Sequence, residues 1–297
     1  MFKNLQLYRL PAPWPITAAA LEHAIAHQAF TPASSNELLR QGWEAPREGG
    51  ALVHNVAGQY LLRLKSEKKV MPAAAVNARA NAMADELEEQ QGFRPGKKAM
   101  KELKERAADE MLPRAFSVPR AMWVWIDPAN GWLAVDTASP SKADEVIKLL
   151  LKAVDKMPLG SLRVQRSPVA MMTAWLEADE APHNFTIDQD TELRATGESR
   201  AAVRYVKHTL DPEDIRRHIA AGKQSTRLAM TWGSRISFVL TESLAIKRIK
   251  ALDVLKEGHA LAYSDHERLD NDFTLMSGEL AKLLADLVEA LGGEAKA

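Results

Sequence analysis

The side chains of this sequence that could do chemistry are cations grouped in its second half. If the segment RAAVRYVKH (200–208) is a strand, its alternating side chains place Arg200, Arg204 and His208 on one face. Residues 194–227 contain eight Lys or Arg against four Asp or Glu, a net charge of +4. Cations grouped in this way suit phosphate groups. The candidate phosphate-binding residues of this segment are Arg200, Arg204, Lys207, His208, Arg216, Arg217, Lys223 and Arg227.

A second basic segment is KKAMKELKERAADEML (97–112), which favours a helix. Lys97, Lys98 and Lys101 are its candidate phosphate contacts, and Lys97 and Lys101 share one helix face at i, i+4 spacing. The alternative is a solvated helix whose lysines pair with glutamates of the same helix. Both interpretations stay open at this point.

A catalytic set is not evident in the sequence. The chain has no cysteine, and it contains no glycine-rich phosphate loop, HExxH motif or GxSxG motif. The pairs Asp188/Asp190 and Asp270/Asp272 could hold Mg²⁺ in a nuclease, although helix caps and solvated turns explain them more simply. We therefore expect no enzymatic activity, no metal and no cofactor.

Composition indicates a soluble protein whose charge is unevenly distributed. The 297 residues are 46% hydrophobic and 26% charged, with a formal net charge of zero. From residue 253 to the end, ten acids stand against four bases, so this region is acidic while 194–227 is basic. The start lacks a signal-peptide pattern, and no apolar run approaches the ~20 residues of a membrane helix. We expect a cytoplasmic protein with one basic surface and no membrane partner.

The strands and helices expected along the chain would position these cations, and their order predicts an α+β fold. We expect an elongated, multi-lobed subunit with mixed or antiparallel sheets. AMWVWID (121–127) and WLAVD (132–136), joined by PANG, form the clearest predicted β-hairpin. A second hairpin is expected over 51–65, turning near Gly58. Further strands are expected at 2–10, 183–187, 200–208, 224–232, 235–240 and 244–250.

Apolar periodicity and capping residues predict the helices. The helix over 211–222 begins at Asp211, which serves as its N-cap. The last helix, over 276–291, has an apolar stripe that includes Leu280 and Leu284. Other helices are expected over 17–27 and from Ser141 to about residue 154.

The segments 72–91 and 97–112, joined by GFRPG, predict an antiparallel helical hairpin. Its apolar content is low, so it should protrude rather than form a core. Phe116 follows this hairpin, and at the tip of a protrusion its ring would seek a partner. The predicted domains are a discontinuous central α+β domain (1–71 and 117–160), a helical-hairpin tip domain (72–116) and a base domain with the main dimer interface (161–297).

Longer stretches of the chain form a more specific pattern. They include FKNLQLYRL, AFTPASSNELLRQGW, LPRAF followed by MWVWIDPANGWLAVDTAS, DPEDIRRHIAAGK and FTLMSGELAKLLADLVEALGGE. In this order, and over essentially the whole chain, they resemble the RdgC family of recombination-associated proteins.

The resemblance implies a nucleoid-associated, non-enzymatic DNA-binding protein of the bacterial cytoplasm. Members of the family form a homodimer closed head-to-head and tail-to-tail into a ring with a basic inner surface. Duplex DNA, and possibly single-stranded DNA, is the implied partner, bound with little base specificity. Occupying DNA would limit RecA-promoted recombination and contribute to the control of replication and recombination.

The resemblance also implies roles for particular residues. Phe116 would lie at the tip-to-tip contact that closes the ring. Lys207 and His208 would belong to a polar finger that reaches toward DNA, with Arg114 and Arg204 as further phosphate contacts. The helix that carries Leu280 and Leu284 would help to build the other subunit interface.

Two rival hypotheses stay open. The acidic C-terminal region would suit a protein-interaction factor that acts directly on RecA, with incidental DNA binding. The paired aspartates would suit a Mg²⁺-dependent nuclease.

Overall fold

The structure is a computed structural model that describes residues 1–197, 200–256 and 264–295. Its residues form two compact units. The first comprises Met1–Ile25, Ala45–Leu62 and Trp123–Ala297, and the second comprises Ala26–Glu44 and Arg63–Met122. Antiparallel strands and α-helices occur together, which confirms the predicted α+β class. Within the described ranges, none of the helices has the length and apolarity needed to cross a membrane.

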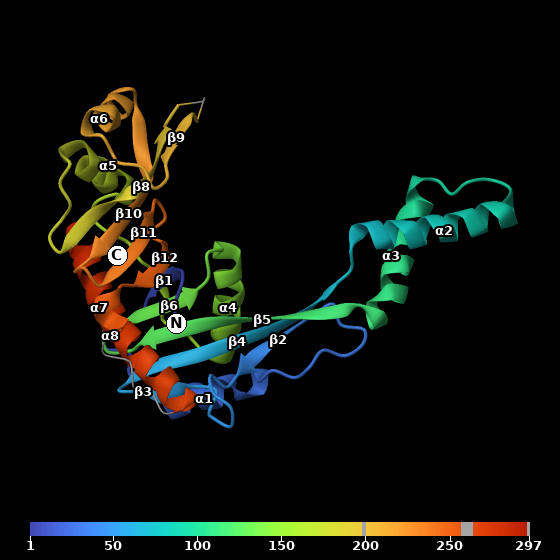
Figure 1. The fold of residues 1–297 in the computed structure, drawn as a ribbon. Coiled ribbons are helices and arrows are strands. Elements are labelled where there is room, and N and C mark those ends of the chain that lie inside the picture. The colour runs from blue at the N-terminus through green and yellow to red at the C-terminus, as the bar shows by residue number, and fades with distance from the viewer. Residues whose placement is uncertain (198–199, 257–263, 296–297) are drawn as a thin grey trace. The chain divides into compact units, whose positions relative to one another are not determined.

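The first unit is built on an antiparallel sheet with the strand order β5-β6-β1-β12-β11-β10-β8-β9, to which β5 contributes only its residues from Trp123 onward (Figure 1). The bounds are β5 (Phe116–Asp127), β6 (Trp132–Asp136), β1 (Leu5–Arg9), β12 (Ile246–Ala251), β11 (Ile236–Thr241), β10 (Lys223–Trp232), β8 (Phe185–Ala195) and β9 (Ala202–Tyr205). Two short strands join it at the side, with β3 (His54–Val56) beside β4 (Gln59–Val70) and β7 (Gly160–Ser161) beside β1. Both predicted β-hairpins are confirmed.

The core of the first unit lies between one face of this sheet and several helices. Strands contribute Leu193, Leu228, Met230, Phe238 and Leu240, while helices α5 (Pro168–Ala178) and α8 (Asp265–Ala290) contribute Met172, Trp175, Phe273, Leu280 and Leu287. The remaining helices of this unit are α1 (Ala18–Ile25), α4 (Pro140–Ala153), α6 (Pro212–Ala220) and α7 (Asp253–Lys256). The opposite face of strands β8 to β12 carries the candidate site.

Helix α8 is longer than the sequence periodicity predicts, because a capping box starts it earlier. The side chain of Ser264 accepts a hydrogen bond from the Glu267 N–H, and the Glu267 carboxylate accepts one from the Ser264 N–H. These two bonds satisfy amide groups that the first turn leaves without helical partners. The expected start near residue 276 is therefore wrong, although the apolar stripe is confirmed.

Several other expectations need correction at their boundaries. Ser139, rather than Ser141, precedes α4, because Pro140 occupies the first helical turn, where its missing N–H costs nothing. Helix α5 was not predicted. The strand expected over 200–208 is reduced to β9, since Arg200 and Lys207 have φ values of 45° and 50°. Left-handed backbone interrupts the strand alternation, so the expected single row of Arg200, Arg204 and His208 is wrong.

The second unit combines a strand pair with two helices. Residues 39–44 of β2 (Leu39–Glu44) pair antiparallel with residues 63–68 of β4. Helices α2 (Ala73–Gln91) and α3 (Lys97–Met111) follow, and η2 (Leu112–Arg114) leads into β5. The predicted helices are confirmed, and they pack on one another through Ala80, Met83, Ala84, Leu103 and Ala107. Their protrusion from the rest of the chain stays a prediction.

Lys69 links three separate segments of the second unit. Only 6% of this residue is exposed, and its ammonium group donates to the backbone carbonyls of Ser35 and Leu112, the latter at 2.8 Å. Leu112 opens the short helical turn that ends α3. Carbonyls at the end of a helix favour a cation, which accounts for a buried lysine at this place.

Candidate nucleic-acid interface

The open face of strands β8 to β12 carries charged side chains in register. Glu192 pairs with Arg204 on β9 and with Arg227 on β10, so one cross-strand row reads Arg204–Glu192–Arg227. The neighbouring residues Leu193 and Leu228 point the other way, into the core. Strand alternation therefore separates a charged face from an apolar one.

Glu192 is the centre of this row. Only 2% of the residue is exposed, and its carboxylate accepts hydrogen bonds from Arg204 (3.0 Å from Nε), Arg194 (2.6 Å) and Thr226 (3.1 Å). Burial raises the pKa of Glu192, but the hydrogen bonds from Arg204 and Thr226, with the charges of Arg227 and Arg204, lower it below its usual range. An ionised Glu192 thus fixes arginines whose outer surfaces remain in solvent, since 60% of the Arg204 side chain is exposed.

Asp190, two residues earlier on β8, organises a second group of cations. Its carboxylate accepts the Lys207 N–H at 2.6 Å and an Arg248 N–H at 2.7 Å. The Lys207 N–H lowers the pKa of Asp190; burial opposes this, and Arg248 adds to the lowering. These groups border a hollow of about 760 Å³, which is also lined by Asp188, Ser237, Val239 and Lys250.

The cations of the basic segment 194–227 do not all lie on one surface in the structure. Arg204 and Arg227 lie on the open face, whereas Arg216 and Arg217 lie on α6, which packs through Ile215 into the core on the other side of the sheet. Arg216 donates to the carbonyl of Glu177 at 2.9 Å, and Arg217 pairs with Asp214 at 3.1 Å. The ammonium group of Lys223 lies 3.4 Å from Nδ1 of His218. Arg200 and His208 are exposed.

The basic residues of the second unit are less constrained. Lys97, Lys98 and Lys101 are exposed on α3, and Lys101 forms a long ion pair of 3.8 Å with Glu105. Such a pair between exposed side chains holds neither of them firmly. Arg114 is exposed beside Phe116, and both line a hollow of about 310 Å³ with Val70 and Met111.

The two predicted subunit contacts differ in exposure. Phe116 is 86% exposed, so its ring is available to a partner. Leu280 and Leu284 are 0% and 1% exposed, because they belong to the chain's own core. A subunit contact through α8 would have to use other side chains of this helix.

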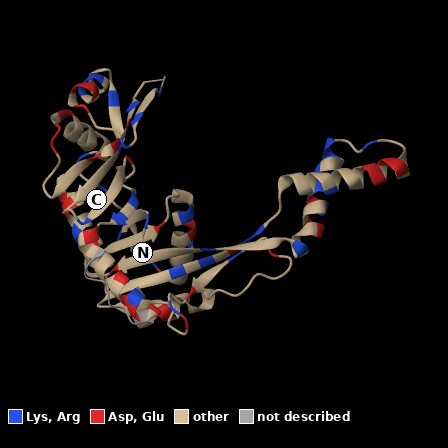
Figure 2. Cartoon of the chain, viewed as in Figure 1, with Lys and Arg blue, Asp and Glu red and all other residues tan. Residues whose placement is uncertain are grey.

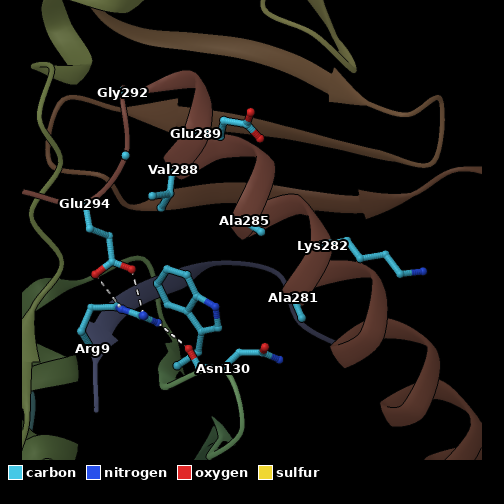
Figure 3. A pocket seen from close by; sticks show the side chains of 11 residues that line it. Arg9, Asn130, Ala281, Lys282, Ala285, Val288, Glu289, Gly292 and Glu294 are labelled. Carbon is cyan, nitrogen blue, oxygen red and sulfur yellow. Dashed lines mark hydrogen bonds and ion pairs between the residues drawn. The ribbon is translucent and has the colours of Figure 1, made fainter. Parts of the chain in front are cut away.

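The outer side of α8 borders a hollow of about 730 Å³ (Figure 3). Ala281 and Ala285 face it from the helix, and Arg9 and Glu294 form an ion pair of 2.8 Å across from them. The Arg9 guanidinium also stacks over Trp132, 4.0 Å from the ring centroid. The hollow combines small apolar side chains with a charge pair that is already satisfied.

Comparison with known proteins decides the family. A family model described as "Putative exonuclease, RdgC" matches residues 1–294. The recombination-associated protein RdgC of Herminiimonas arsenicoxydans is 63% identical over 294 residues, covering 99% of this chain and 98% of that protein. The proteins of the same name from Janthinobacterium sp. (strain Marseille) and Bordetella pertussis are 62% and 58% identical, with the same coverage. The chain belongs to the RdgC family. The predicted resemblance to this family of recombination-associated proteins is thereby confirmed.

The RdgC family is described as a "putative exonuclease", and many nucleases hold metal ions with carboxylates, so the contacts of the paired aspartates bear on this activity. Asp188 accepts a hydrogen bond from Thr231 at 2.9 Å, while Asp190 holds Lys207 and Arg248. Asp270 lies 2.6 Å from Nε2 of His54. Across the described residues, no three His, Asp or Glu side chains form a group that could hold a metal ion. These contacts give the named carboxylates structural partners.

Sequence reasoning missed three cations that lie on the open face of this RdgC chain. They belong to IKRIKA in β12, where Lys247 pairs with Val239 and Lys250 with Ser237. Arg248 lies at an irregularity between them, with a φ of 53°. Figure 2 shows the Lys and Arg residues along the strands of this unit. The available signal was the group of three cations within four residues. Ile246 and Ile249 are three residues apart, so a regular strand would place them on opposite faces; the irregularity at Arg248 lets both be buried.

Proposed function

We propose that this protein binds duplex DNA through backbone phosphates, with little base specificity, and so limits RecA-promoted recombination. The observation that supports this best is the open face of β8 to β12 in a chain of zero net charge. The face carries seven cations and three acids: Arg194, Arg204, Lys207, Arg227, Lys247, Arg248 and Lys250, against Asp188, Asp190 and Glu192. A local excess of fixed cations attracts a polyanion whatever its base sequence.

The proposal includes a second copy of the chain. Two copies would close head-to-head and tail-to-tail into a ring, with the charged faces toward the enclosed DNA. The exposed Phe116 supports one of the two contacts, because an aromatic side chain left in water favours association. A closed ring retains DNA by topology, so several weak phosphate contacts suffice. The protein would act at the bacterial nucleoid, without a cofactor or a catalytic step.

The first experiment measures binding to two labelled duplexes of unrelated sequence over a range of salt concentrations. We expect equal affinities and a log–log salt slope of about −6, if the dimer engages about seven phosphates. The double variant Arg204→Gln/Arg227→Gln should bind both duplexes at least about tenfold more weakly. Its slope should be shallower by about 4, because two contacts are lost from each of the two subunits.

The matched control is Arg216→Gln/Arg217→Gln, which removes the same charge from α6. Its affinity should stay within about twofold of the natural protein, since these arginines lie off the open face. Equal losses in both double variants would show that net charge, rather than the open face, governs binding.

A RecA strand-exchange assay tests the consequence for recombination. Arg204→Gln/Arg227→Gln should lose inhibition in proportion to its loss of DNA binding. Full inhibition by this variant would instead favour direct contact with RecA. Cleavage of labelled DNA in Mg²⁺ or Mn²⁺ would overturn the proposal that the protein is not an enzyme.

A further inference from the structure

Asp190 connects two segments that are distant in the sequence. From β8 its Oδ1 accepts the backbone N–H of Lys207, and its Oδ2 accepts the Nη1 group of Arg248 on β12. The two contacts measure 2.6 and 2.7 Å, as expected for charge-assisted hydrogen bonds. One carboxylate thus fixes the backbone of one cationic residue and the side chain of another.

Both residues that Asp190 holds have left-handed backbone, with φ values of 50° at Lys207 and 53° at Arg248. Residues other than glycine adopt this conformation when surrounding contacts determine it. The Arg248 N–H also donates to Oδ1 of Asn4, at 3.3 Å. These contacts turn Lys207 and Arg248 out of regular strand geometry and toward the same hollow.

The hollow has the chemistry of a phosphate site. Lys207, Arg248 and Lys250 line it, and 64% of the Arg248 side chain is exposed. A guanidinium has five N–H donors, so most of those on Arg248 remain for a ligand after one contact with Asp190. Among the described residues, Lys250 forms no ion pair. The second carboxylate of the hollow, Asp188, accepts from Thr231 at 2.9 Å.

We propose that Asp190 is a positioning residue for a phosphate-binding site formed by Lys207, Arg248 and Lys250. The ligand is a phosphodiester group of the DNA backbone, so the inference rests on the proposed function and adds a defined subsite to it. Asp190 itself does not touch the phosphate. It holds two of the three cations in place and thereby improves binding, although its own charge repels DNA.

This proposal predicts opposite signs for two similar substitutions. Asp188→Asn and Asp190→Asn each remove one negative charge from the same hollow, which by long-range electrostatics alone would tighten DNA binding in both. We expect Asp188→Asn to bind a labelled 30-base-pair duplex about twofold more tightly. Asp190→Asn should bind about three- to tenfold more weakly, because Arg248 loses its charged partner.

A double-mutant cycle with Arg248→Gln tests whether Asp190 acts through that side chain. The loss caused by Asp190→Asn should shrink to less than about twofold in the Arg248→Gln background. A purely structural role for Asp190 would leave its effect unchanged in that background. Thermal unfolding of each variant shows whether the fold is retained.

The exposed cations provide a test that does not depend on the folding of an Asp190 variant. Arg248→Gln and Lys250→Gln should each make the log–log salt slope of the full-length protein shallower by about 2, because each removes one contact from both subunits of the dimer. Unchanged slopes in both would overturn the phosphate site. Tighter binding by a folded Asp190→Asn would overturn the positioning role. Either result leaves the proposed function standing if the natural protein binds duplex DNA, whereas failure of the natural protein to bind would overturn the function itself.

Discussion

The two basic regions of the chain hold their cations in different ways. On the open sheet face, the buried Glu192 fixes Arg204 on the neighbouring strand β9 and Arg194 on its own strand β8. On α3, Lys101 is 81% exposed and reaches only an exposed glutamate of its own helix. Ordering a long side chain costs entropy, so cations ordered before binding lose less when a phosphate arrives. The comparison teaches that a count of lysines and arginines does not rank two surfaces as binding sites.

The strongest way to break the comparison is to remove the carboxylate that orders the sheet face. Glu192→Gln would leave Arg194 and Arg204 without their charged partner around a buried side chain. We expect the free energy of unfolding to fall by about 2 kcal/mol, as measured by urea denaturation. Glu105→Gln on α3 is the control and should change stability by less than about 0.5 kcal/mol. Similar changes in the free energy of unfolding for both variants would show that the two carboxylates stabilise their regions to the same extent, which would contradict the comparison.

The second unit differs from the first in a further way, because its most exposed large apolar side chain, Phe116, is the one proposed to contact a second copy of the chain. Phe116→Ser should release closed circular DNA about tenfold faster, because the proposed contact between two copies would lose its aromatic side chain. Phe93→Ser is the matched control, since Phe93 is also exposed (64%) in the same unit. Retention on closed circles is measured after a challenge with salt. Equal effects of the two serine variants would remove Phe116 from the proposed ring contact.

The lysines of α3 test whether exposed cations without a firm partner contribute less to duplex affinity than the arginines of the sheet face. The triple variant Lys97→Gln/Lys98→Gln/Lys101→Gln removes three charges, yet we expect duplex affinity to fall by no more than about threefold at physiological salt. The loss per charge would then be smaller than for Arg204 and Arg227. Anisotropy titrations with the same duplex measure both. A larger loss per lysine than per arginine would place the principal DNA contact on α3.

The smallest expected effect concerns pH. The pKa of Glu192 is lowered in the folded protein, so its ionised form contributes stability that is fully present above the unfolded-state pKa of about 4.3. This contribution is lost as pH falls through the lower folded-state pKa. The stability difference between the natural protein and Glu192→Gln should therefore be constant near neutral pH and shrink below about pH 4. A difference that stays constant down to pH 3 would contradict an ionised Glu192.

Much of the sheet and its helices could be predicted from the sequence, because strand alternation and apolar stripes are local patterns. The expected strands over 224–232, 235–240 and 244–250 correspond to β10, β11 and β12. The early start of α8 could also have been predicted from the sequence, since Ser264 and Glu267 have the spacing of a capping box. That signal was missed because the apolar stripe alone was used to place the helix.

The arrangement of the candidate site could be predicted only in part. Arg204, Arg227 and Lys207 were expected, but Arg248 was not. Asp190 brings Lys207 and Arg248 together across 17 and 58 residues of sequence. The same contact accompanies the left-handed backbone that makes β9 shorter than expected. Long-range hydrogen bonds of this kind leave no periodic trace in a sequence. Arg216 and Arg217, close to Arg204 in the chain, lie on another side of the sheet because Ile215 packs α6 into the core.

Lys69 has a consequence for the segment that carries Arg114 and Phe116. The ammonium group connects the carbonyl of Leu112, at the end of α3, to that of Ser35, so the residues just before Phe116 are held by a lysine 43 residues earlier in the chain. Neutralising this one amine, by acetylation or by a methionine, would free two carbonyl oxygens together. The loop at Ser35 and the turn at Leu112 that leads to Phe116 would then both lose a restraint, although the sequence of neither segment had changed.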